Sequence, residues 1–179
     1  MIFTEDSNNY SLKINPLLSP EELNKGLWLV IAGVTDIPPH IALIADDKYY
    51  SVTARKVKVG EPIDKFLKAI SRRSLPTLFV SIKSSNMSGL KETFEFYPTL
   101  GNGEHTCHWP IRDFFVKSSS SEFTDATLVF ELLSVAQKQG LLLVCKSLFV
   151  DIKSETMVLP KYTPEQIREK INSILKVNE

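Results

Sequence analysis

The chain has too few cysteines to form a disulfide framework. Its 179 residues include two, Cys107 and Cys145, which lie far apart in the sequence. Small secreted domains that depend on disulfides carry several cysteines at short spacings. The residues from Met1 to Asp6 show no basic segment followed by an apolar one, so we expect no secretory signal. These absences predict a reducing, cytoplasmic environment with free thiols.

Long apolar runs and an excess of one charge are also missing. The longest apolar stretch, Gly140 to Ile152, is interrupted by Lys146 and is shorter than the roughly 20 residues that a membrane helix needs. Lysine plus arginine and aspartate plus glutamate number 21 each, so the formal net charge is zero. A balanced surface has no general attraction to nucleic acid or anionic lipid. We therefore expect no nucleic-acid partner and no membrane span.

Motifs that hold cofactors or metals are scarce as well. The glycine-containing segment 101–103 lacks the lysine and the helix spacing of a phosphate-binding loop. His105, Cys107 and His108 form a single cluster, whereas structural zinc uses four donors that are usually arranged as two spaced pairs. We expect no cofactor and no metal.

Hydrophobic periodicity predicts one α+β domain that spans residues 1–179, long enough for one well-covered core. Apolar or alternating segments predict strands at 27–34, 40–45, 49–59, 77–83, 141–152 and 156–159. Capping residues and helical spacing predict helices at 20–26, 63–70, 110–116, 124–140 and from 163 onward. This order favours a central, mostly antiparallel sheet with flanking helices.

The remaining segments are less regular. Residues 1–18 are polar and are predicted to form an extended, irregular N-terminal arm. Residues 84–97 fit either a helix after Ser88 or a strand that begins at Thr93. Residues 98–104 are expected to be a loop, and residues 118–121 a polar link.

His40 opens an apolar strand directly after Pro38 and Pro39. Prolines restrict the backbone, so this entry fixes the direction of the imidazole, which suits a general base. The strand leads through a turn at residues 46–48 into a second strand. A single histidine can equally cap a strand, or lie half-buried with one ring nitrogen bonded to a carbonyl. The sequence leaves both interpretations open.

Cys107 comes just before the predicted helix at 110–116. Unpaired N–H groups at a helix start favour the thiolate and lower a thiol's pKa, and a thiolate is the nucleophile of acyl transfer. The flanking His105 and His108 can add positive charge. A buried cysteine is more often a small apolar filler, and Cys145, which follows an apolar run, fits that description. Cys107 lies among polar and aromatic residues and is expected to be reachable.

The segment from His40 to Tyr50, HIALIADDKYY, resembles the histidine strand of the circularly permuted NlpC-type papain-like hydrolases, which include the lecithin:retinol acyltransferase-like enzymes. In that family a histidine opens a strand, and the nucleophilic cysteine comes later and starts a helix; His40 and Cys107 follow this order. The turn has Asp46-Asp47-Lys48 where the family usually has glycine, and the run Thr106-Cys107-His108-Trp109 around the cysteine differs from the acyltransferases' Asn-Cys-Glu-His. The likeness covers roughly residues 30–54.

The resemblance implies a permuted papain-like fold and a thiol hydrolase or acyltransferase. Cys107 would attack the acyl carbon of a small-molecule or peptide substrate (an amide, peptide or ester), and His40 would take its proton. The third group is a polar residue on the second strand, where counting places Ser51, Val52 or Thr53 opposite His40. Ser51 or Thr53 would orient the imidazole, and backbone N–H groups near Cys107 would stabilise the oxyanion.

A non-catalytic binding or interaction module is the alternative. The same scaffold would then present a contact surface of aromatic residues, because large exposed apolar patches usually mark partners. The candidate residues are Trp109, Phe114, Phe115, Tyr49 and Tyr50. The departures from the family pattern, which include the lack of an obvious third catalytic group, leave an active enzyme and an inactive relative both open.

Overall fold

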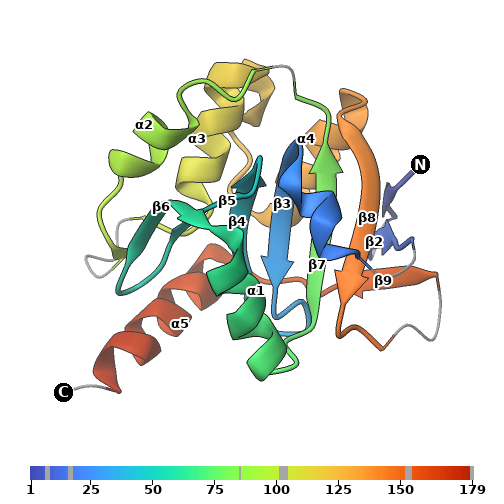
Figure 1. Cartoon of the computed structure of the whole chain (residues 1–179). Coiled ribbons are helices and arrows are strands. Elements are labelled where there is room, and N and C mark those ends of the chain that lie inside the picture. The colour runs from blue at the N-terminus through green and yellow to red at the C-terminus, as the bar shows by residue number, and fades with distance from the viewer. Residues whose placement is uncertain (7–8, 16–17, 85, 101–104, 152–154, 178–179) are drawn as a thin grey trace.

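Two antiparallel sheets and five α-helices make up the protein in a computed structural model, which describes residues 1–6, 9–15, 18–84, 86–100, 105–151 and 155–177 (Figure 1). The central sheet has the strand order β6 (Val57–Pro62), β5 (Lys48–Val52), β4 (His40–Ala45), β3 (Leu27–Ala32), β7 (Thr77–Ile82) and β8 (Leu142–Leu148). A small sheet joins β1 (Phe3–Glu5), β2 (Tyr10–Lys13) and β9 (Thr156–Leu159). The α+β class predicted from the sequence is confirmed.

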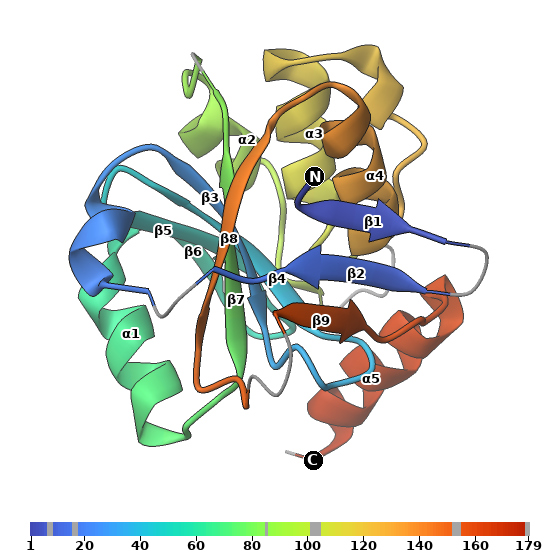
Figure 2. The same cartoon turned by 90° about the vertical axis from the view of Figure 1, so that its right-hand side faces the viewer.

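The helices cover both faces of the central sheet (Figure 2). They are α1 (Ile63–Arg72), α2 (Leu90–Glu95), α3 (Trp109–Ser118), α4 (Val129–Lys138) and α5 (Pro164–Lys176), with short 3₁₀ turns η1 (Pro20–Asn24) and η3 (Ser121–Phe123). Alternate residues of the fully buried β3 enter two cores. Trp28 and Val30 pack with η1 and α1, while Leu29 and Ile31 pack with the small sheet and the other four α-helices.

The predicted hairpin around residues 46–48 is confirmed, with a turn of two residues. Ala45 pairs with Lys48, and the intervening Asp46 and Asp47 have φ angles of 44° and 68°. Positive φ at both central residues is the geometry of a type I′ turn, which matches the twist of the strands. The Asp46 carboxylate also accepts the Gly26 amide at 2.9 Å. This bond helps to hold the hairpin without the glycine that such turns usually contain.

The prediction of one long strand at 49–59 is wrong, because a turn divides it into β5 and β6. The Thr53 hydroxyl accepts the Lys56 amide at 2.9 Å and donates to the Lys56 carbonyl at 2.9 Å. Such side-chain bonds to the backbone compete with the bonds of a sheet ladder. The chain therefore folds back after Val52.

The helix predicted from Thr124 begins later, at Val129. The Thr124 hydroxyl donates to the Ser121 carbonyl at 2.7 Å and completes η3 instead. The helix start is set by Glu131, whose carboxylate accepts the Thr127 and Leu128 amides at 2.7 and 2.9 Å. A glutamate that bonds back to the residue before the helix is half of a capping box.

The N-terminal residues are not an irregular arm. They form β1 and β2, with Phe3 and Leu12 buried in the core. The Gln137 side chain of α4 accepts the Ile2 and Phe3 amides at 3.3 and 3.1 Å. The pairing of β2 with β9 and the Gln137 contact both join residues far apart in the sequence, so no local sequence pattern predicts them.

Other expectations fare better. The strand positions of β3, β7, β8 and β9 and the positions of α1 and α3 are confirmed, as is the capping box of Thr163 that begins α5. The ambiguous segment at 84–97 contains the helix α2. Residues 101–104 of the predicted loop lie outside the described residues. Within the described part of the chain, no helix combines the length and the apolar character that crossing a membrane requires.

Candidate functional site

A cavity of about 330 Å³ lies at the end of the central sheet where β4 begins. Six segments contribute to its wall: Asp36 and residues 38–40 at the entry to β4, residues 53–54 after β5, Arg73 after α1, Leu100, Cys107 ahead of α3, and one face of α5. Figure 1 shows α5 running past this end of the sheet. Segments far apart in the sequence thus meet around one space.

Cys107 is placed two residues before α3, with its thiol against the start of β4. The backbone N–H groups of Ile41 and of Cys107 itself lie close enough to the sulfur to lower the pKa of the thiol. Because Ile41 directly follows His40, the thiol lies next to the histidine's own backbone. Both side chains line the same cavity.

The electrostatics of Cys107 differ from the sequence-based expectation. Burial raises the pKa of the thiol, and the two amide hydrogen bonds lower it by less. The predicted lowering of the pKa by the helix start is therefore wrong. Loss of hydration destabilises a thiolate more than two N–H donors stabilise it here. The resting thiol is protonated at neutral pH.

His40 is held by a serine on the neighbouring strand. Its Nε2 lies 2.8 Å from the Ser51 hydroxyl oxygen, and Ser51 is 1% exposed. Burial, followed by the positive charge of Lys58, lowers the pKa of His40 from its ordinary 6.5 to about 4. The imidazole is thus neutral at physiological pH, the form in which a ring nitrogen can accept a proton.

The second ring nitrogen of His40 is uncommitted. Among the described residues, none forms a hydrogen bond with its Nδ1, and no hydrogen bond joins the ring to the Cys107 sulfur. In the tautomer whose Nε2 donates to Ser51, Nδ1 carries the lone pair. The site therefore holds a neutral thiol and a neutral imidazole rather than a preformed ion pair.

Thr53, the other candidate for the third group, lines the cavity but does not orient the imidazole. Its hydroxyl is engaged with Lys56 in the turn between β5 and β6. The regular pairing of β4 with β5 runs from Ala45 and Lys48 to Leu43 and Tyr50 and does not extend to His40. Counting along an ideal hairpin therefore left the two hydroxyls undecided.

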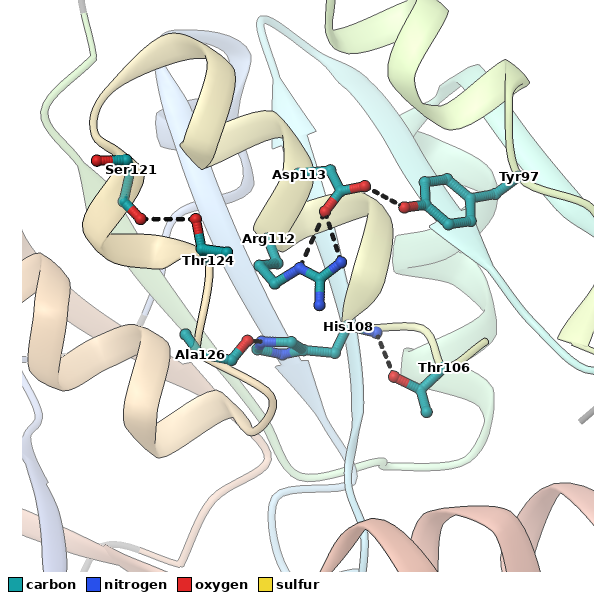
Figure 3. A network of polar contacts seen from close by, with 8 residues as sticks. All are labelled: Tyr97, Thr106, His108, Arg112, Asp113, Ser121, Thr124 and Ala126. Atoms are coloured by element: carbon teal, nitrogen blue, oxygen red, sulfur yellow. Dashed lines mark hydrogen bonds and ion pairs between the residues drawn. The ribbon is translucent and has the colours of Figure 1, made fainter. Parts of the chain in front are cut away.

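His108 anchors the segment that carries Cys107 (Figure 3). Its Nε2 donates to the Ala126 carbonyl at 2.8 Å, and its amide donates to the Thr106 hydroxyl at 3.3 Å. Burial lowers the pKa of His108 to about 4 despite the opposing effect of the Ala126 bond. The expected contribution of positive charge from His108 is therefore wrong; the ring stays neutral and fixes the backbone.

The first turns of α3 are also held from the side of α2. The Arg112 guanidinium bonds Asp113 at 2.8 and 2.9 Å, and Tyr97 donates its hydroxyl proton to the same carboxylate (Figure 3). Arg112 also lies 4.7 Å from the centre of the Trp109 ring. His105 packs against Tyr97 and Trp109 with ring centres 5.5 and 4.9 Å apart. These contacts fix the approach to Cys107.

The aromatic contact surface proposed for a binding module is reduced to two half-buried rings, Trp109 and Tyr50, because its other three residues are buried. Phe114 and Phe115 are each 1% exposed and Tyr49 is 3% exposed, so these rings belong to the core. Among the described residues, no group of three or more His, Cys, Asp or Glu side chains is placed to hold a metal ion. Cys145 is completely buried in β8, as expected of a filler.

The contribution of α5 was not predicted. Its spacing of isoleucines indicated a core-facing helix, and Ile167 and Ile171 are indeed buried. The sequence does not reveal that the same face closes the cavity over the thiol. The Arg55 guanidinium donates to the Ile174 carbonyl at 2.9 Å and ties the last part of α5 to the turn after β5.

Comparison of the chain with models of protein families, with curated proteins and with solved structures gives no match.

Proposed function

We propose that this protein is a thiol hydrolase or acyltransferase that uses Cys107 as nucleophile and His40 as general base. One observation carries the proposal: Cys107 and His40 both line one cavity. The backbone of Ile41, the residue after His40, is also among the groups that lower the pKa of the Cys107 thiol. A strand-borne histidine followed by a helix-start cysteine is also the order of the permuted papain-like hydrolases, and we propose this arrangement for the fold.

The proton moves during the attack, because neither group is charged beforehand. The sulfur forms a bond to the acyl carbon while His40 Nδ1 takes the thiol proton, and the carbonyl oxygen becomes an oxyanion. The imidazolium then protonates the leaving group as the acyl bond breaks. Water, or an acceptor alcohol or amine, attacks the resulting thioester with His40 again as base, and this restores the thiol.

Ser51 and two backbone amides support these steps. Ser51 holds Nε2 at 2.8 Å, and the proposed mechanism uses the other ring nitrogen, Nδ1, as the base. The amides of Ile41 and Cys107 are donors near the reacting sulfur, and we assign them to the carbonyl oxygen of the substrate, where negative charge develops. A serine carries no charge to stabilise an imidazolium, so slower turnover is expected than with a carboxylate in this position.

Acyl-enzyme trapping tests the proposal directly. The protein is mixed with p-nitrophenyl esters and acyl thioesters of increasing chain length, quenched with acid and analysed by mass spectrometry of its peptides. We expect an acyl adduct on Cys107 in the unaltered protein and in the matched variant Cys145→Ala, and none in Cys107→Ala. Absence of an adduct and of turnover with every ester would contradict the proposal.

A non-catalytic binding domain on the same scaffold is the second candidate. The raised pKa of the Cys107 thiol favours it, since a reactive cysteine usually has a lowered one. The trapping experiment separates the two candidates, because a binding domain would retain the ester unchanged.

A further inference from the structure

The cavity beside Cys107 has an apolar wall that continues to its mouth. Ile167, Ile171 and Ile174 of α5 all line it. Their spacing of four and three residues places them on one helical face. Ile167 and Ile171 are buried, whereas Ile174 is 38% exposed, so the apolar strip reaches solvent. Such a wall suits an aliphatic chain.

Two cations stand along the same cavity. Arg73 follows α1, and Lys170 lies on the face of α5 that carries the isoleucines. Both are exposed, and neither forms an ion pair with another described residue. Asp36 is the acid among the lining residues, so the charges along the wall are two positive and one negative. An anionic group on the occupant would be attracted there.

The size of the cavity limits the length of the chain. Its volume of about 330 Å³ holds about eleven groups of the size of a water molecule, which occupies ~30 Å³ in the liquid. It lies near the lower end of ordinary ligand sites. An eight-carbon chain with one carboxylate has a matching number of non-hydrogen atoms, whereas a long lipid chain exceeds the space.

We infer that the cavity binds a medium-chain aliphatic molecule that carries a carboxylate or similar anionic group. As the substrate class of Cys107, this rests on the proposed function: the acyl chain would lie along the isoleucines of α5 and the anionic group would meet Lys170 and Arg73. As a binding site it stands on the lining residues alone.

Calorimetry with octanoate and its neutral analogue octanamide tests the binding. We expect octanoate to bind the full chain about tenfold more tightly or better, since a tenfold ratio corresponds to one favourable charged contact. The double variant Arg73→Met/Lys170→Met should reduce octanoate affinity to that of octanamide and leave octanamide binding unchanged. Lys176→Met, on the same helix but outside the cavity wall, should bind octanoate normally. Ile174→Ser should weaken both ligands.

The inference is overturned if octanoate and octanamide bind equally, if neither binds at millimolar concentration, or if the double variant binds octanoate as the unaltered protein does. Turnover of mono-p-nitrophenyl suberate and p-nitrophenyl octanoate is measured in parallel. Octanoate binding without turnover of either ester supports the site and contradicts the proposed function. Turnover of both esters at equal rates supports the proposed function and overturns the anionic preference.

Discussion

The two cysteines lie in different surroundings: Cys145 is fully buried, whereas Cys107 is only partly buried. Both are free thiols whose pKa is raised by burial, to about 12 for Cys145. Cys145 is enclosed in β8, where its neighbour Val80 on β7 belongs to the core. Cys107 faces a cavity, receives two backbone N–H groups, and shares that cavity with His40.

The different surroundings of the two thiols indicate what the reactivity proposed for Cys107 would depend on. Burial alone makes a thiol inert, because it disfavours the thiolate. Cys107 differs from Cys145 in its neighbours, which include a proton acceptor, hydrogen-bond donors and room for a ligand. In the proposed mechanism, chemistry at Cys107 depends on a base that acts during the reaction, and the comparison between the two thiols can be tested through that dependence.

Removing each thiol in turn should produce the largest contrast. Cys107→Ser is expected to lower kcat/KM for an ester substrate by more than about a thousandfold, as loss of a nucleophile does in other covalent enzymes. Cys145→Ala should leave kcat/KM unchanged and lower the free energy of unfolding by about 1–2 kcal/mol, because it leaves a small void in the core. Steady-state kinetics and urea unfolding measure the two effects. Comparable kinetic losses in both variants would remove the distinction.

The base should reveal itself in the pH dependence of kcat/KM. His40→Gln is expected to reduce kcat/KM by about 10²–10⁴-fold, the usual contribution of a general base. In the unaltered protein the pKa of about 4 keeps His40 neutral above that pH. Activity should thus stay level from pH 8 to 5 and fall only as the pH approaches 4. An acidic limb near pH 6.5 would instead indicate a solvated histidine.

Acid should destabilise the region around Cys107 through His108. Its folded pKa of about 4 lies below its ordinary 6.5, so the unfolded state binds more protons in this interval. Stability is complete above pH 6.5 and is lost as the pH falls towards 4, by about 3 kcal/mol at pH 4. His108→Gln keeps a side-chain N–H donor for Ala126 and should lose less stability in that window. Urea unfolding at pH 7 and pH 4.5 compares the two proteins, and equal losses would refute the role of His108.

Ser51 and Thr53 provide the smallest and most discriminating contrast. Ser51→Ala removes the hydrogen bond to His40 and is expected to lower kcat about tenfold, equivalent to one hydrogen bond of about 1.4 kcal/mol. Thr53→Ala should leave kcat unchanged and reduce the free energy of unfolding by about 1 kcal/mol through loss of its turn contacts. If Thr53→Ala lowered kcat and Ser51→Ala did not, Thr53 rather than Ser51 would orient the His40 imidazole.

Local features of the candidate site were predictable. Pro38 and Pro39 predicted an ordered entry to the strand of His40, and the residues after Cys107 predicted a helix. Sequence reasoning limited the hydroxyl that orients the ring to two candidates but did not choose between them, because the regular pairing of β4 with β5 ends before it reaches His40. The pKa of Cys107 was predicted in the wrong direction, because a sequence indicates a helix start but not the burial around it.

The sequence by itself determined the α+β class, most of the strands and helices, and the order of histidine and cysteine, because these follow from hydrophobic period, capping residues and proline position. Only the tertiary structure decided that Ile41 meets the Cys107 sulfur, that Ser51 holds His40, and that α5 closes a cavity with two cations on its wall. Each of these contacts joins segments distant in the chain, and their energies depend on burial, which only the packed structure creates.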